Sequence, residues 1–192
     1  VKTCREMMLG VINKLESAVK FRGSISGIDT GFCDLNDILD GIQSEYIILG
    51  ARASIGKTAL AVNIAKNMIR KKIPVGYFSL EMSGESLMMR MLSDETSVQA
   101  RILRCGMLGD KQLTTINNRG YEMSQYPLYV MDKTRGELTK IISKSRYMVR
   151  VMGVKCIFID HASLIRHPDR KMKRYEQFSE ISNEIQALQR EL

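Results

Sequence analysis

The chain has 192 residues, of which 44% are hydrophobic and 26% charged, and its formal net charge is +8. This composition is typical of a soluble globular domain with a substantial core. No run of about 18 apolar residues occurs and the N-terminus lacks the apolar stretch of a signal peptide, so we expect neither a membrane span nor export. The positive charge permits a polyanionic partner without requiring one.

The cysteines and histidines give no sign of a metal site. Two histidines, His161 and His167, are not spaced as metal ligands, and we expect a local structural role for each. The cysteines form no C-x-x-C pair, which argues against zinc and against a disulfide framework and suits a reducing cytoplasm. They are scattered along the chain at Cys4, Cys33, Cys105 and Cys156.

The first segment is predicted to be a helix over residues 1–20, because apolar side chains recur on one of its faces. Glycine and serine residues between positions 23 and 27 then interrupt the pattern. We therefore divide the chain into a linker helix, residues 1–22, and a core, residues 23–192. The apolar face of the helix must be buried somewhere, either on its own domain or on another subunit.

The core is predicted to alternate between strands and helices. Apolar runs predict strands at 46–50, 75–80, 128–131 and 156–159. Helical periodicity is expected in the stretches between them, at about 57–72, 83–94, 96–105, 110–124 and 137–151, and again from Tyr175 to Leu192. This alternation predicts an α/β fold with a doubly wound, mostly parallel sheet, in which ligands bind beyond the carboxyl ends of the strands.

A phosphate-binding loop is predicted between the first strand and its helix. The pattern G-x-x-x-x-G-K-[ST] is met by residues 51–58 except that Ala51 replaces the first glycine. Gly56 admits phosphates close to the backbone, Lys57 would reach the β- and γ-phosphates, and the Thr58 hydroxyl would bind Mg²⁺. The alternative is a turn with a surface lysine. The predicted nucleotide contacts are Arg52, Ala53, Ser54, Ile55, Gly56, Lys57, Thr58 and Ala59.

Two carboxylates end apolar strands where the ligand of such a sheet binds. Asp160 follows Lys57 by 103 residues and is placed to hold Mg²⁺ from the side opposite Thr58; otherwise it is an ordinary strand end. Glu81 is the candidate for polarising the attacking water, with Lys57 as its catalytic partner; otherwise it is a solvated residue before a helix.

A basic stretch, residues 166–174, carries five lysine or arginine residues and follows the strand that ends at Asp160. It could contact the phosphates of a polyanionic partner, which for the family that the chain resembles would be DNA, or it could be a solvated connector, which its charges and Pro168 favour.

Six segments in order along the chain resemble the motor domain of DnaB-type replicative helicases. They cover residues 30–36, 51–58, 78–82, 89–92, 101–108 and 180–182. The resemblance implies a RecA-like ATPase that hydrolyses ATP with Mg²⁺ at the subunit interfaces of a homo-hexamer and so translocates along single-stranded DNA. It assigns catalysis to Glu81 and Lys57, nucleotide binding to the loop, and Mg²⁺ to Thr58 and Asp160.

The resemblance also implies partners and a location. A primase and a helicase loader are expected, in the cytoplasm of a bacterium and at its nucleoid, with no membrane. The family's linker helix packs on the neighbouring subunit, and residues 1–20 match its position. Other classes of protein compatible with the motifs are a recombination or clock ATPase of the RecA superfamily, and a module that binds ATP only to hold a ring together.

The chain departs from the family in three respects. Where the family has Asp-Tyr-Leu-Gln-Leu, residues 160–164 retain only the aspartate and the last leucine, and Ala53 replaces a usual proline. The family's sensor glutamine, main DNA loops and arginine finger lie beyond Leu192. Because that arginine completes the site of a neighbouring subunit, the resemblance implies little or no ATPase activity for these 192 residues alone.

Overall fold

A computed structural model of the chain describes residues 3–20, 25–52, 54–132, 136–168 and 172–192. The chain forms two compact units, Val1–Ser44 and Glu45–Leu192. The predicted division between residues 22 and 23 lies outside the described residues and stays a prediction. Within the described residues, no helix is both long and apolar enough to cross a membrane.

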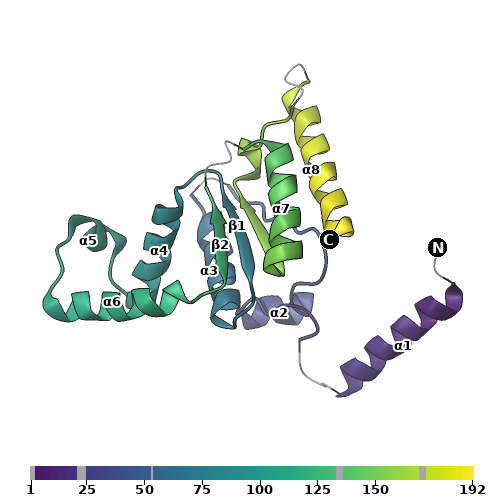
Figure 1. Ribbon diagram of the computed structural model, residues 1–192, viewed down its shortest axis with the longest axis horizontal. Coiled ribbons are helices and arrows are strands. Elements are labelled where there is room, and N and C mark those ends of the chain that lie inside the picture. Colours follow the sequence, from purple (N-terminus) through teal and green to yellow (C-terminus); the bar gives the residue numbers. More distant parts are fainter. Residues whose placement is uncertain (1–2, 21–24, 53, 133–135, 169–171) are drawn as a thin grey trace. The chain divides into compact units, whose positions relative to one another are not determined.

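The first unit contains two helices and a small bridge (Figure 1). Helix α1 spans Cys4–Lys20, as the periodicity predicted, and helix α2 spans Cys33–Leu39. An antiparallel bridge joins Ile28 to Ile42. The buried side chain of Asn36 organises the entrance to α2, because its Oδ1 accepts hydrogen bonds from the backbone N–H and the hydroxyl of Thr30, at 3.0 and 2.7 Å.

The second unit is built on a three-stranded parallel sheet. Strand β1 (Val75–Ser79) lies between β2 (Leu128–Met131) and β3 (Cys156–Asp160). The register pairs Phe78 with Met131 on one side and Ser79 with Asp160 on the other. These strands match three of the four predicted ones, and the predicted parallel α/β fold is confirmed. The carboxyl ends of all three strands meet at one edge of the sheet.

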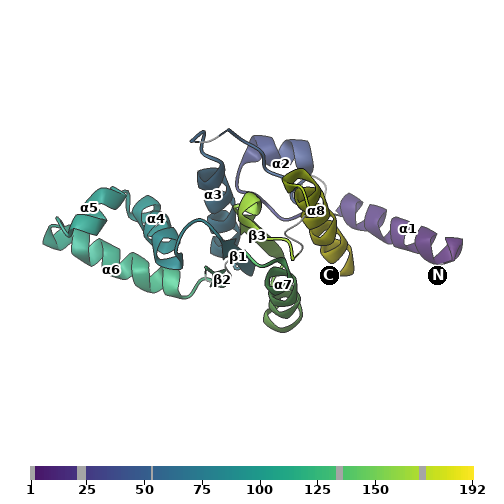
Figure 2. The same ribbon diagram turned by 90° about the horizontal axis from the view of Figure 1, so that it is seen from above.

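Helices cover both faces of this sheet (Figures 1 and 2): α3 lies on one face and α7 on the other. Each predicted helix is present with its ends shifted by a few residues. The helices of this unit are α3 (Lys57–Arg70), α4 (Gly84–Thr96), α5 (Ala100–Cys105), α6 (Asp110–Ser124), α7 (Leu138–Met152) and α8 (Arg174–Glu191), with a short 3₁₀ helix η1 at Ala162–Leu164.

Alternation along β1 sends neighbouring side chains to opposite faces. Phe78 is fully buried in a cluster that includes residues of α7 and α8. Tyr77 points the other way and stacks on Phe158 of β3, with ring centroids 5.7 Å apart. Gly76 allows α7 to approach closely, because a Cβ there would lie 2.9 Å from the Met148 sulfur. Asp160, two residues after Phe158, therefore lies on the Tyr77 face, the same face as α3.

The predicted strand at 46–50 is wrong. Within the described residues these positions make no main-chain hydrogen bond to another strand, and Ile48 is 67% exposed. Among the contacts of the described residues, a 3.2 Å hydrogen bond between the hydroxyls of Tyr46 and Ser182 joins this segment to α8. An apolar, β-branched run supplies strand propensity, but a strand also needs a partner, and none of the three strands that the structure describes pairs with this run.

Candidate active site

The predicted phosphate-binding loop is a tight turn that leads directly into α3. The backbone N–H of Ile55 approaches the carbonyl of Arg52 at 3.4 Å, and both Ser54 (φ 63°) and Gly56 (φ 112°) are in the left-handed region. Such a backbone suits glycine, which explains Gly56 directly before the helix. No atom lies within 4 Å of the position where a Cβ of Gly56 would stand, so the approach to the start of α3 is open on that side.

Most of the predicted nucleotide contacts are exposed in this loop. Arg52, Ser54, Ile55, Gly56 and Ala59 are exposed, and Lys57 and Thr58 are partly buried in the first turn of α3. Ala53, which stands where the family has proline, lies outside the described residues. The free N–H groups of the first turn and the helix dipole favour an anion at this point.

Lys57 and Asp160, 103 residues apart in the sequence, form an ion pair across the edge of the sheet. Lys57 Nζ lies 3.3 Å from Asp160 Oδ1, and the two side chains are only 23% and 10% exposed. Tyr77 donates a long hydrogen bond, 3.4 Å, to the other carboxylate oxygen. Burial raises the pKa of the Tyr77 phenol, and the Asp160 charge beside it raises that pKa further. Tyr77 is therefore a neutral donor to Asp160.

Sequence reasoning did not single out Tyr77. The signal was available, because Tyr77 and Asp160 occupy same-face positions of two apolar strands. Their adjacency, however, depends on β1 and β3 being neighbours in the sheet. Strand order cannot be read from the spacing of apolar residues.

Glu81 lies in the turn that follows β1, beside the end of β3. The N–H of Leu80 donates to the Asp160 carbonyl at 2.6 Å, and the Ser79 hydroxyl donates to the Met82 carbonyl at 2.7 Å. The Glu81 side chain itself is exposed and makes no hydrogen bond or ion pair with any residue that the structure describes. Its carboxylate is thus available to accept a proton at the edge where Lys57 and Asp160 meet.

The residues at this edge fit a magnesium nucleotide. Mg²⁺ prefers oxygen ligands and is commonly held by one or two side chains together with substrate phosphates. Asp160 offers a carboxylate and Thr58 a hydroxyl, while Lys57 offers a cation for the phosphates. In the described part of the chain no group of three or more acidic, histidine or cysteine side chains could hold a metal by itself. The donor set is that of a site whose metal arrives with the nucleotide.

Comparison with protein families identifies the family of the chain. Residues 27–192 match the family described as DnaB-like helicase C terminal domain. The chain belongs to that family. The resemblance predicted from the sequence motifs is therefore confirmed, and the match covers the loop, Glu81 and Asp160 together.

Named relatives of this DnaB-like chain are replicative helicases. The chain is 37% identical to the replicative DNA helicase DnaB of Treponema pallidum (strain Nichols), over 100% of its own length and 44% of the relative. It is 36% identical to DnaB of Geobacillus stearothermophilus, over 100% and 43% of the two chains. For the replicative DNA helicase DnaC of Bacillus subtilis (strain 168) the values are 35%, 98% and 42%. The chain spans less than half the length of these curated relatives.

Solved structures of the family share the fold. One solved ATPase domain superposes with a TM-score of 0.92 at 26% identity, covering 100% of this chain and 68% of that one. A DnaB-like replicative helicase, determined with its interactions with primase, gives a TM-score of 0.85 at 26% identity, with 100% and 46% covered. The predicted RecA-like fold is thereby confirmed for this DnaB-family chain.

A third carboxylate at this edge of the DnaB-like fold, besides Asp160 and Glu81, has a structural contact that sequence reasoning missed. Asp132 directly follows β2, and its Oδ2 accepts a 2.7 Å hydrogen bond from the backbone N–H of Gly84, the first residue of α4. Its sequence signal, an apolar strand ending in aspartate, equals that of Asp160. Strand pattern alone therefore does not distinguish which of these two aspartates faces the phosphate loop.

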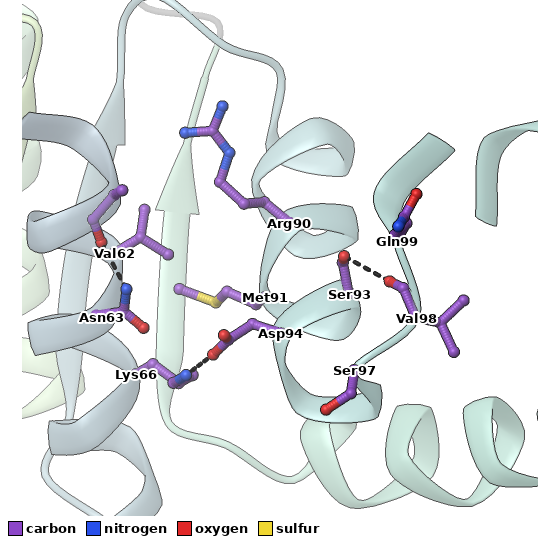
Figure 3. Close-up of a pocket in the computed structure, with 11 residues that line it drawn as sticks. Val62, Asn63, Lys66, Arg90, Met91, Ser93, Asp94, Ser97, Val98 and Gln99 are labelled. Carbon is purple, nitrogen blue, oxygen red and sulfur yellow. Dashed lines mark hydrogen bonds and ion pairs between the residues drawn. The ribbon is translucent and has the colours of Figure 1, made fainter. Parts of the chain in front are cut away.

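The hollow between α3 and α4 lies on the far side of the phosphate-loop helix from α8 and has a volume of about 430 Å³ (Figure 3). At one end the buried Lys66 forms an ion pair with Asp94, and Arg70 pairs with Glu95 close by. Burial lowers the pKa of Lys66, and the charge of Arg70 lowers it further. Arg90 is directed toward the other end of the hollow. The two ion pairs fasten the phosphate-loop helix to the helix that follows Glu81.

The segment after β3 departs from the family sequence and makes its own local contacts. His161 Nδ1 and the Ser163 hydroxyl lie 2.6 Å apart, so two residues that replace family residues contact each other. The peptide bond between Asp160 and His161 is cis. His167 pairs with Glu180 at 2.9 Å, and Arg174 donates to the Ser163 carbonyl.

The basic stretch is described only in part, because residues 169–171 lie outside the described residues. A second hollow of about 250 Å³ is lined by Arg166, His167, Arg174 and Gln177. Whether this stretch contacts DNA or is a solvated connector stays a prediction.

Proposed function

We propose that this chain is the ATP-hydrolysing motor of a replicative DNA helicase, working at the subunit interfaces of a homo-hexameric ring that translocates along single-stranded DNA. Membership of the DnaB-like family supports this function, and the site supports the chemistry. A primase and a helicase loader are the proposed protein partners, and the proposed location is the bacterial cytoplasm at the nucleoid. The solved DnaB-like helicase with its interactions with primase supports the first of these partners.

The proposed division of labour follows from the geometry at the sheet edge. Arg52, Ala53, Ser54, Ile55, Gly56 and Ala59 surround the phosphates, and Lys57 leaves Asp160 to bind the β- and γ-phosphates. Thr58 and Asp160 hold Mg²⁺, which when bound would neutralise charge on the same phosphates. Glu81 accepts the proton of the attacking water.

One observation carries the proposal: the 3.3 Å pairing of Lys57 with the buried Asp160, directly beside the turn that presents Glu81. Taking a lysine and an aspartate out of water costs free energy, which their mutual attraction often does not fully return. In this pair each charge balances the other, and each partner has a ligand of opposite charge in a magnesium nucleotide.

Turnover of Mg-ATP by the native-length protein, measured with and without single-stranded DNA, tests the function. A helicase motor hydrolyses ATP, is stimulated by the strand and separates a forked duplex. Binding of ATP without turnover would instead identify a module that only holds a ring together. Turnover without strand separation would identify a recombination or clock ATPase. The family match favours the helicase over both.

A further inference from the structure

The turn that carries Glu81 is short and held at both ends. Only residues 80–83 separate β1 from α4. At its start the N–H of Leu80 donates to the Asp160 carbonyl, and within it the Ser79 hydroxyl donates to the Met82 carbonyl. At its end the N–H of Gly84 donates to Asp132 Oδ2 at 2.7 Å. Glu81 therefore lies in a turn that is hydrogen-bonded to the end of β3 on one side and to the residue after β2 on the other.

The Asp132 contact is more than an ordinary helix cap. Helix α4 already has its own cap, because the Ser83 hydroxyl accepts the N–H of Ser86 at 3.2 Å. Asp132 lies 48 positions away in the sequence, so its hydrogen bond ties the first residue of α4 to the sheet. A carboxylate is also the favoured charge at a helix N-terminus. The contact fixes where the helix begins relative to β2.

Close packing at Gly84 shows how tightly the helix start is held. A Cβ on this residue would lie 3.3 Å from Asp132 Oδ2 and 3.4 Å from Val130 Cγ1. A side chain at position 84 would crowd these atoms, so the two side chains or the start of α4 would have to shift by a few tenths of an ångström. Since Glu81 is three residues before Gly84, such a displacement would move the segment that presents its carboxylate.

We propose that Asp132 is a positioning residue for Glu81: it holds the start of α4 against the end of β2 and thereby keeps Glu81 where it can accept a proton from the attacking water. This inference rests on the proposed function. The proposed role of Asp132 does not involve nucleotide binding, which is assigned to the loop at residues 51–58. Loss of the contact should consequently slow the chemical step and leave nucleotide affinity intact.

The test is Asp132→Ala in the native-length protein. We expect kcat for Mg-ATP to fall by about 10- to 100-fold, the cost typical of a misplaced catalytic group, with KM within about twofold of the parent. Asp132→Asn should restore most of the rate, because its amide oxygen can accept the same N–H. A parent-like kcat for the alanine variant would overturn the proposal.

A matched control separates positioning from stability. Gln112→Ala removes a comparable side-chain cap at the start of α6, where Gln112 Oε1 accepts the Gly109 N–H at 3.2 Å. It should lower the thermal midpoint about as much as Asp132→Ala and leave kcat unchanged. An equal loss of kcat in both variants would assign Asp132 a structural role only. If Asp132→Ala fails to fold, Gly84→Ala gives a second test, since it disturbs the same contact with Asp132 still present.

Single-turnover hydrolysis in a Glu81→Gln background decides whether Asp132 acts through Glu81. If it does, adding Asp132→Ala to that background should slow hydrolysis no further. A further tenfold loss, on the order of the single-variant effect, would overturn the proposal. The failure of the proposed function is distinguishable, because the parent protein itself would then show no turnover of Mg-ATP or no strand separation.

Discussion

Two segments of this chain follow the same plan and end in different environments. Residues 46–58 and 75–84 each begin with an apolar run, continue through a short turn and enter a helix, and each supplies a proposed active-site residue, Lys57 or Glu81. Strand β1 is buried along its whole length and pairs on both edges. Residues 46–50 are unpaired, and Ile47, Ile48 and Leu49 are exposed.

The difference shows that an apolar run becomes a strand only when two conditions are met: its side chains are buried and its backbone pairs with a neighbouring strand. The pattern specifies side chains that gain free energy from burial, about 25 cal/mol for each Å² removed from water. It does not specify the neighbouring strand whose N–H and carbonyl groups must pair with its own. Where partners exist on both sides, as for Phe78, the run becomes the centre of a sheet.

The largest effect is expected at the paired segment, in Glu81→Gln. The amide keeps the shape of the side chain and loses the proton acceptor, so hydrolysis of Mg-ATP should slow by about 10²–10⁴-fold. Binding of Mg-ATP, measured by titration of the same variant, should match the parent. A loss of affinity as large as the loss of rate would make Glu81 a structural residue of the turn.

The next effect contrasts the two apolar runs directly. Phe78→Ala should lower the free energy of unfolding by about 3–5 kcal/mol, because it leaves a cavity in the cluster beneath α7 and α8. Ile48→Ala should change it by less than about 0.5 kcal/mol, as expected for a side chain that is 67% exposed. Denaturant titration of both variants measures the two values. A large loss of unfolding free energy in Ile48→Ala would show that residues 46–50 are buried in solution, as strand β1 is.

Lys57→Ala tests the unpaired segment. The variant should bind Mg-ATP about 100-fold more weakly, since it loses a charge-assisted contact with the phosphates worth about 3 kcal/mol. Calorimetric titration with Mg-ATP gives the affinity, and the thermal transition shows that the fold survives. Parent-like affinity in a folded variant would remove the loop from the nucleotide site.

The smallest effect is expected for Tyr77→Phe. The hydroxyl donates to Asp160 over 3.4 Å, so its loss should cost about 0.5–1.5 kcal/mol of stability and less than about tenfold in turnover. Lys57 still neutralises the aspartate in this variant. A loss of turnover equal to that of Glu81→Gln would mean that Tyr77 does more than orient Asp160.

Much of this fold could be predicted from the sequence because local pattern and tertiary role agree. The strands at 75–80, 128–131 and 156–159 are apolar and β-branched, and each pairs in the sheet. The helix after Gly56 was predictable from its apolar spacing, and its residues Ala65 and Met68 are fully buried. In the active site, Asp160 was expected at the end of its strand and Lys57 at the start of a helix, and the structure has both there, paired at one edge of the sheet.

The remainder depends on contacts that carry no local signal. The strand at 46–50 was predicted wrongly because propensity was read without a partner. Asp132 and Tyr77 were missed because their roles follow from the order β2-β1-β3, which brings together residues that are 48 and 83 positions apart. The ion pairs of α3 with α4 were missed for the same reason, since Lys66 and Arg70 resemble the solvated face of a helix.

A main-chain crossing links the segments that follow β2 and β3. The N–H of Arg166 donates to the Gly136 carbonyl at 2.7 Å, and Gly136 (φ 70°) passes so close to Leu164 that a Cβ would overlap its carbonyl oxygen. Any residue at position 166 other than proline can supply this N–H, so most substitutions of Arg166 leave the hydrogen bond in place. Gly136 is different, because a side chain there would force the two segments apart.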